Sequence, residues 1–211
     1  MFNQGFPTVY IGGLGDNSFL QQHFRKGWEL ENDSLFDNAI EEYKKCLENP
    51  KATESNKVAL HILIGNCYYK LSWLKEAEKH YFEAKRITEE VSDKREQLKG
   101  KSAVLSNIGF IYSAYGKLDE ALKFHQETLE IDWETGIEHE IASDLGNIGL
   151  LYSDMGRPDE ALKFHREALK INMSIGFEQG IASAMGNIGL IYHGLGKPDE
   201  ALKYLQEALE I

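Results

Sequence analysis

The sequence contains a segment that recurs at a fixed distance of 40 residues. The string LSNIGFIY begins at Leu105, LGNIGLLY begins at Leu145 and MGNIGLIY begins at Met185. Residues 141–171 and 181–211 agree at 20 of their 31 positions, far more than a shared helix-forming composition would give. Such self-similarity constrains the fold strongly, because each copy can bury its apolar face only by stacking on its neighbours. The chain is therefore predicted to be an array of repeated units.

Two less regular copies precede these three. The segment from Ile64 lies 44 residues before its counterpart in the next copy, and the segment from Phe24 lies 38 residues before its own. Only four prolines occur beside many Ala, Leu, Glu and Lys, which favours helix because unbranched side chains lose little rotamer freedom there. We predict an irregular N-terminal leader over residues 1–18 and an array over residues 19–211, with repeats at about 19–50, 57–94, 101–140, 141–180 and 181–211.

Each copy carries a glycine inside its predicted first helix, where glycine costs about 1 kcal/mol relative to alanine. An alanine follows each glycine twelve residues later, in the predicted second helix. We expect this pair of small residues to let the two helices approach closely, and that packing would offset the cost of the glycine. The glycines are Gly27, Gly65, Gly109, Gly149 and Gly189, and the alanines are Ala39, Ala77, Ala121, Ala161 and Ala201.

Turn and cap residues separate the predicted helices. In the last three copies a glycine stands between the two helices, where a left-handed conformation can close the first helix. In the last two copies a proline follows, which suits a helix start because the N–H that proline lacks has no partner there. Ser72 occupies the turn glycine's position in the second copy. The turn glycines are Gly116, Gly156 and Gly196, the prolines are Pro158 and Pro198, and Gly136 and Gly176 are expected to cap the second helices.

One copy carries small and aromatic residues that resemble the signature of the tetratricopeptide repeat family, at Gly149, Tyr152, Gly156, Ala161 and Ala168. The family's common unit has 34 residues. The 40-residue copies are similar to the repeats of Pins-type polarity adaptors and to the slightly longer repeats of kinesin light chains. The resemblance implies an all-α fold, a right-handed α-solenoid of about five helix-turn-helix repeats whose first helices line a concave groove. It also implies that the chain binds other proteins or peptides.

Helical periodicity divides the first helix of the fourth copy into two faces. Leu145 and Ile148 fall on the stripe toward the partner helix, whereas Asn147 and Leu150 fall on the opposite stripe, toward the groove. Asparagine recurs on the groove stripe of the last three copies at mid-helix, where it is a poor helix former. Its carboxamide could pair with the N–H and C=O of a passing peptide. The alternative is that each asparagine bonds a carbonyl or a side chain of a neighbouring repeat.

A second position on the groove stripe is apolar in four copies and could form a floor that supplies affinity. Packing between adjacent first helices is the alternative role of this position. Asn66 replaces the apolar residue in the second copy, and His193 is the histidine expected to face the groove. The predicted peptide-binding residues are Asn66, Asn107, Asn147, Asn187, Phe110, Leu150, Leu190, His193, Trp28 and Tyr69.

Charge and hydropathy exclude several classes of partner. The formal net charge of −11 argues against binding to nucleic acid or to an anionic membrane surface, so a neutral or basic protein or peptide is expected. No stretch approaches the 18 or more apolar residues that a membrane span requires, and a cytoplasmic location is expected. Cys46 and Cys67 fall on predicted helices as small core residues, so neither a disulfide nor a metal site is predicted, and no cofactor is expected.

The chain is predicted not to be an enzyme. No Ser/His/acid, Cys/His or carboxylate-pair arrangement recurs at a spacing that would converge within a helical hairpin. His125 and His165 align with the core aromatic position of the second helix, so they are expected to be packing residues. Three functions stay open, namely a peptide-binding scaffold or adaptor, a structural self-assembly module, and the sensing arm of a larger regulatory protein.

The last helix is expected to be incompletely covered. From Pro198 to Ile211 it carries an apolar stripe, including Leu202 and Leu209, that is broader than one partner helix would cover. Repeat arrays usually end in a helix with a polar outer face. The sequence therefore predicts that further copies follow in the native protein, and that this chain forms a homo-oligomer through its uncapped C-terminal repeat.

Overall fold

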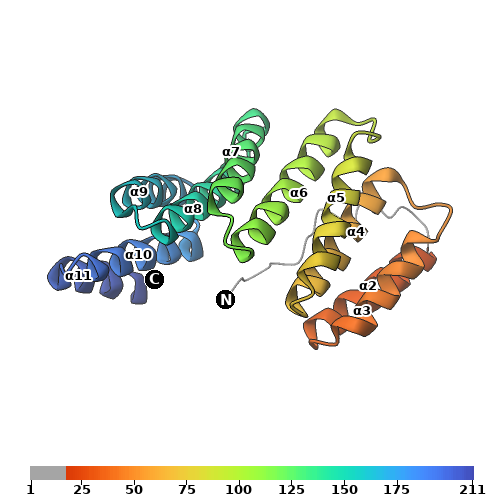
Figure 1. Cartoon of the computed structure of the whole chain (residues 1–211), viewed down its shortest axis with the longest axis horizontal. Helices are drawn as coiled ribbons and strands as arrows, with labels where there is room; N and C mark the ends of the chain where they lie inside the picture. Colours follow the sequence, from red (N-terminus) through yellow and green to blue (C-terminus); the bar gives the residue numbers. More distant parts are fainter. Residues whose placement is uncertain (1–17) are drawn as a thin grey trace. The chain divides into compact units, whose positions relative to one another are not determined.

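The computed structural model describes residues 18–211, and this part of the chain forms ten α-helices and no strand (Figure 1). The all-α repeat fold that the sequence predicts is confirmed. The irregular leader predicted for residues 1–18 lies outside the described residues, except for Ser18, which begins the first helix.

The chain divides into two compact units, residues 1–111 and 112–211, and each is described by itself. The N-terminal unit contains α2 (Ser18–Asn32), α3 (Phe36–Leu47), α4 (Glu54–Lys70), α5 (Leu74–Thr88) and all but the last residues of α6 (Lys94–Ala114). The C-terminal unit contains α7 (Leu118–Thr135), α8 (Glu138–Asp154), α9 (Pro158–Ile175), α10 (Glu178–Gly194) and α11 (Pro198–Leu209).

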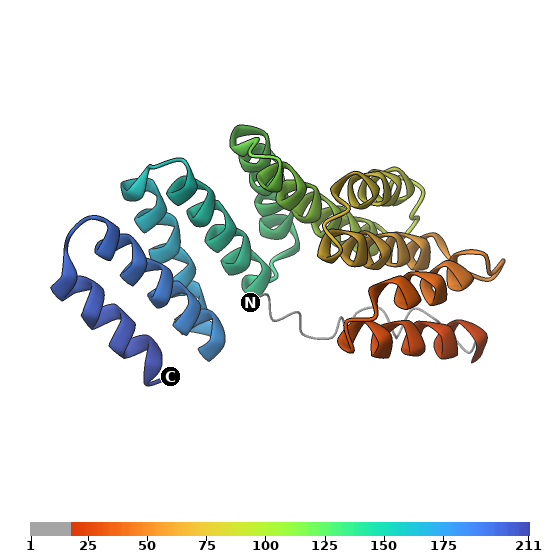
Figure 2. The same cartoon turned by 60° about the horizontal axis from the view of Figure 1, so that its bottom comes forward.

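Within each unit the helices pack as antiparallel hairpins. In the N-terminal unit α2 packs on α3 and α4 packs on α5, and the contact of α3 with α4 joins the two hairpins. In the C-terminal unit α8 pairs with α9 and α10 pairs with α11, and α10 also contacts both helices of the preceding hairpin (Figure 2). Each of these four hairpins therefore buries its own interior and packs one face against its neighbour in the same unit.

The closest approach inside a hairpin is made by the glycine of its first helix. A Cβ atom placed on Gly149 would lie 2.8 Å from the ring of His165, and one on Gly65 would lie 2.4 Å from the ring of Tyr81. The nearest neighbour is thus the large side chain sixteen residues later. The close approach that the glycine and alanine pair predicts is present, and the side chain that meets the glycine lies one turn beyond the alanine, because a helical side chain leans toward the N-terminus and covers the preceding turn. Ala161 is fully buried and leaves room for that side chain.

Different side chains occupy this interior position in different hairpins. In the second hairpin it is Tyr81, whose hydroxyl donates a 2.7 Å hydrogen bond to Oδ1 of Asn66. In the last hairpin it is Leu205, which packs on the helical glycine without any polar group. In the fourth hairpin it is His165, which is fully buried and whose two ring nitrogens have no hydrogen-bond partner among residues 18–211. The expectation that His165 packs inside the hairpin is confirmed.

The turns between paired helices adopt the left-handed conformation that their glycines predict. Gly116, Gly156 and Gly196 have φ between 70° and 73°. Ser72 holds the same position in the second hairpin with φ 62°, and Ser34 holds it in the first with φ 61°. Residues with a Cβ pay about 1–2 kcal/mol in this conformation, so the two serine turns are strained where the glycine turns are not.

The Ser72→Gly variant is expected to stabilise the chain by about 1 kcal/mol, because it removes the steric cost of a left-handed serine. The reverse change, Gly156→Ser, places the same serine in an equivalent turn and should destabilise by a similar amount. Urea unfolding followed by circular dichroism measures both differences. Equal stability of Ser72→Gly and the wild-type chain would mean that the serine turn carries no strain.

The long second helices of the C-terminal unit end at glycines, as expected. Both α7 and α9 have 18 residues, and their C-caps are Gly136 at φ 70° and Gly176 at φ 68°. The amide of Gly136 donates to the carbonyl of Asp132, which satisfies one of the carbonyls left open at the helix end. The glycine cap therefore accounts for where these long second helices stop.

Two buried aspartates meet where α7 packs on α8. Asp132 and Asp144 are almost completely buried and share a hydrogen bond, whereas Oδ2 of Asp144 has no partner among the described residues. Burial, the charge of Asp132 and the nearby Glu140 together raise the pKa of Asp144 to about 9. At neutral pH the Asp144 carboxyl is therefore protonated and donates to its neighbour.

This raised pKa predicts that the stability of the chain changes with pH. The folded state binds a proton at Asp144 that the unfolded state releases near its ordinary pKa of 3.8, so this group's contribution to stability falls as the pH rises from about 4 to about 9. The Asp144→Asn variant has no proton to release at this position, so it should not show this decrease in stability. It should be close to wild type in stability at pH 4 and more stable by over about 1 kcal/mol at pH 8, since one pKa unit is worth about 1.4 kcal/mol. Urea unfolding at both pH values measures the free energy of unfolding of the wild-type chain and of the variant. An equal difference between the two proteins at pH 4 and pH 8 would contradict the prediction.

Candidate functional site

The two first helices of the C-terminal unit, α8 and α10, turn the same type of face away from the core. On α8, Leu145 and Ile148 are buried against the hairpin interior, as the helical periodicity predicts. Leu150 is 42% exposed, and Leu190, its counterpart on α10, is 61% exposed. Leu150 and Leu190 therefore remain accessible and are not enclosed between neighbouring helices.

The predicted groove asparagines fall into two groups. Nδ2 of Asn107 donates to the carbonyl of Ala103, one turn earlier in α6, at 2.7 Å, and Asn66 accepts from the Tyr81 hydroxyl. Asn147 and Asn187 are half-buried, and within residues 18–211 neither side chain makes a hydrogen bond. The intramolecular role that the sequence analysis left open thus applies to the N-terminal pair, and the carboxamides on α8 and α10 keep their donors and acceptors.

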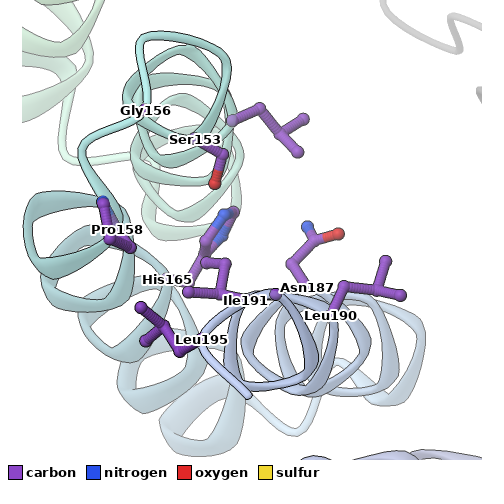
Figure 3. Close-up of a pocket in the computed structure, with 10 residues that line it drawn as sticks. Ser153, Gly156, Pro158, His165, Asn187, Leu190, Ile191 and Leu195 are labelled. Carbon is purple, nitrogen blue, oxygen red and sulfur yellow. The ribbon is translucent and has the colours of Figure 1, made fainter.

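A pocket of about 380 Å³ opens between α8, α9 and α10 (Figure 3). Asn187 and Ile191 project into it from α10, Ser153 projects from α8 on the opposite side, and the ring of His165 lies between them. None of the residues that line it carries a full charge. They are Leu150, Ser153, Gly156, Pro158, His165, Asn187, Leu190, Ile191, Gly194 and Leu195.

His165, whose ring faces the pocket, is in its neutral form. Burial lowers the pKa of its imidazole to about 4, because the surroundings cannot solvate an imidazolium ion. The ring is held in place by its contact with Gly149. Since neither nitrogen has a partner within the described residues, the ring is not coupled to a carboxylate or to a nucleophile as a catalytic base would be.

Sequence reasoning predicted only part of this pocket. Asn187, Leu150 and Leu190 line it, whereas His193 is exposed on α10 one residue before the lining Gly194. Trp28, Tyr69 and Phe110 are half-buried on helices of the N-terminal unit. The lining residues that the prediction missed include Pro158, Ile191 and Leu195. The sequence analysis named Gly156 and Pro158 only as turn and helix-start residues, which did not indicate that they line a pocket.

Other site classes have little support in the described part of the chain. No cluster of three or more His, Cys, Asp or Glu among residues 18–211 could hold a metal ion. Cys46 and Cys67 are fully buried free thiols, and burial raises their pKa to about 11 and about 12, so both are the inert core residues that the sequence predicts. None of the helices between residues 18 and 211 combines the length and apolar character needed to cross a bilayer.

Comparison with known proteins identifies the repeat. The family model of the tetratricopeptide repeat matches residues 100–174 and 140–211, which together make up more than half of the sequence. The chain belongs to the tetratricopeptide repeat family. A search of curated protein sequences found no match.

Solved tetratricopeptide repeat structures share the fold at low sequence identity. A signal transduction ATPase with a tetratricopeptide repeat sensor from Pyrococcus horikoshii matches with a TM-score of 0.79 and 21% identity, over 90% of this chain and 28% of that one. The Rap conjugation gene regulator of plasmid pLS20, solved with the Phr* peptide, matches with a TM-score of 0.73 and 19% identity, over 90% and 52%. Kinesin light chain-like repeats from Podosopora anserina match with a TM-score of 0.71 and 14% identity, over 90% and 93%.

Two glycines of α8 should respond in opposite ways to the same substitution. A Cβ placed on Gly146 would have no neighbour within 4 Å, so Gly146→Ala should stabilise the tetratricopeptide array by up to about 1 kcal/mol through helix propensity. Gly149→Ala should destabilise by about 1–3 kcal/mol, because its methyl group would overlap the His165 ring. Urea unfolding of the two variants compares them directly. The packing described for α8 and α9 would be wrong if both changes stabilised the chain.

Proposed function

We propose that the chain is a protein-interaction scaffold that captures an extended peptide segment of a partner protein along α8 and α10. Membership of the tetratricopeptide repeat family supports an interaction scaffold in general. The fold similarity to a regulator solved with a bound peptide is consistent with a peptide as the ligand. The location on α8 and α10 rests on the residues of these two helices.

The observation that carries the proposal is the unpaired state of Asn147 and Asn187. Both stand at mid-helix, where asparagine lowers helix stability, and neither side chain makes a hydrogen bond among the described residues. Each carboxamide can donate to a peptide carbonyl and accept from a peptide N–H. An extended chain lying across α8 and α10 would therefore be held by its backbone at two equivalent points.

Glycines beside the two asparagines favour a close approach of the peptide. Gly146 precedes Asn147 and Gly186 precedes Asn187, and the space where each Cβ would lie is empty to 4 Å. Each glycine lowers helix stability by about 1 kcal/mol, and no packing contact within the hairpin requires it. Absence of a side chain at these positions leaves room for a ligand backbone to reach the carboxamides.

The distribution of charge favours a neutral or basic partner. Residues 112–211 contain 18 acidic and 8 basic residues, a net charge of −10, whereas residues 1–111 contain 16 and 15, a net charge of −1. Almost all of the negative charge of the chain thus belongs to the unit that carries α8 and α10. A field of this sign accelerates the encounter with a basic segment and repels an acidic one.

Peptide binding can be tested with the double variant Asn147→Ala, Asn187→Ala. Peptides selected from a random display library on the wild-type chain would be titrated by fluorescence anisotropy. We expect the double variant to lose at least about tenfold in affinity for every selected sequence, because backbone hydrogen bonds do not depend on the peptide's side chains. The exposed asparagines of the N-terminal unit supply the control, Asn32→Ala with Asn38→Ala, which should leave affinity unchanged.

The peptide-scaffold proposal fails if the selected peptides bind the double variant as tightly as the wild-type chain. It fails equally if no peptide from the library binds the wild-type chain above background. Circular dichroism of each variant ensures that a lost affinity does not reflect a lost fold.

Self-assembly is a second candidate, favoured by the exposed apolar side chains of α11. Leu202 is 56% exposed and Leu209 is 87% exposed, although both belong to the apolar stripe of an amphipathic helix. Burying such a face against a second copy would remove it from water. Light scattering over a range of concentrations separates the two candidates, because assembly through α11 requires a dimer that Leu202→Lys dissociates.

A third role, as the sensing arm of a larger regulator, is compatible with peptide capture. The Pyrococcus horikoshii protein that shares this fold carries its repeats as a sensor, and the present chain spans 28% of its length. In such an arrangement a peptide bound along α8 and α10 would be the signal. Sequencing of the complete gene would reveal whether an effector domain accompanies the repeats.

A further inference from the structure

We infer that the pocket between α8, α9 and α10 receives one uncharged, apolar side chain of the captured peptide, about the size of leucine or phenylalanine. This inference rests on the proposed peptide scaffold and adds sequence selectivity to it. The asparagines would hold any extended backbone, whereas the pocket would select one position of the ligand by its side chain.

The lining of the pocket sets the chemistry of its occupant. Five lining side chains are apolar, and they surround the space together with three polar but uncharged ones, Ser153, His165 and Asn187. A lysine or a glutamate entering here would leave its hydration shell without meeting an opposite charge, which is costly. The volume of about 380 Å³ is ample for one large apolar side chain such as leucine or phenylalanine.

Comparison of two hairpins of this chain explains why the space is open. In the second hairpin, Tyr81 extends past the helical glycine until its hydroxyl reaches Asn66 at the floor position of the groove. In the fourth hairpin the equivalent interior residue is the shorter His165, and the floor residue is Leu150. The fourth hairpin therefore has no tyrosine ring between His165 and Leu150, and both of these residues line the pocket.

The state of His165 reinforces selection against charged side chains. Because burial keeps the imidazole neutral around pH 7, it offers no positive charge to a carboxylate. A cationic side chain would likewise meet only the dipoles of Ser153 and Asn187, because the pocket contains no carboxylate. The negative charge of the C-terminal unit thus acts on the peptide as a whole, while the pocket remains selective for an apolar residue.

Continuity with the backbone site identifies a peptide as the occupant. Asn187 belongs to both places, since it is one of the two unpaired carboxamides and also lines the pocket (Figure 3). Leu150 and Leu190 lie three residues after Asn147 and Asn187, one helical turn further along the same faces. A peptide bonded to Asn187 would therefore pass the mouth of the pocket and could insert a side chain.

The preference of the pocket for an apolar peptide side chain can be tested by adding one positive charge at its mouth. The Leu190→Lys variant puts an ammonium group at the mouth of the pocket, and Met173→Lys changes an equally exposed apolar side chain of α9, outside the pocket, as the matched control. Random peptide libraries would be selected on the wild-type chain and on both variants, and the selected peptides would be titrated by fluorescence anisotropy. A third variant, Ser153→Leu, adds apolar bulk inside the pocket from α8.

We expect the wild-type chain and Met173→Lys to select an apolar residue at one fixed peptide position, where exchange for Asp lowers the affinity at least about tenfold. Leu190→Lys should shift the preference at that position to Asp or Glu, and Ser153→Leu should reduce it to small residues. If peptides bind through Asn147 and Asn187 but show no preference at any position, or if Leu190→Lys selects the same residues as the wild-type chain, the pocket inference is overturned and the scaffold stands. If no peptide binds, both fall together.

Discussion

The contact between a helical glycine and one large side chain of the paired helix determines how each hairpin closes. At Gly27, Gly65, Gly149 and Gly189 a Cβ atom would collide with that side chain, so the two helices can approach only because the glycine lacks one. This approach orients the rest of the first helix. With its glycine stripe against the partner, the asparagine and leucine positions of α8 and α10 necessarily turn outward.

The same interior position links the stability of a hairpin to the shape of its groove. A tyrosine there completes a hydrogen bond to the floor residue, as Tyr81 does with Asn66, and fills the space beneath the groove. A histidine leaves that space open and buries two ring nitrogens without partners in the described chain, which costs stability. The fourth hairpin thus combines an open pocket with a polar group that packing alone would not select.

The sequence was sufficient to predict the elements whose cause is local or periodic. The 40-residue repeat, the left-handed turn at Gly156 and the cap at Gly176 each depend on residues close together in the chain, and all three are confirmed. The neighbour of Gly149 could not be predicted from residue size alone, because it depends on the direction in which the side chain of His165 leans. The separate behaviour of Asn107 and Asn147 was equally hidden, since both occupy the same repeat position and differ only in their three-dimensional surroundings.

The paired aspartates of α7 and α8 have a consequence for how nearly identical repeats avoid misassembly. The last two copies are so alike that α10 could in principle dock where α8 belongs, a slip of one whole repeat. At the position of Asp144, however, α10 carries Ala184, and a slipped stack would leave the buried carboxyl of Asp132 without its hydrogen bond. The α9–α10 junction has Asn172 facing Gly180 instead, so the two junctions are not interchangeable. A pair that lowers stability at neutral pH thereby penalises a stack that is displaced by one repeat.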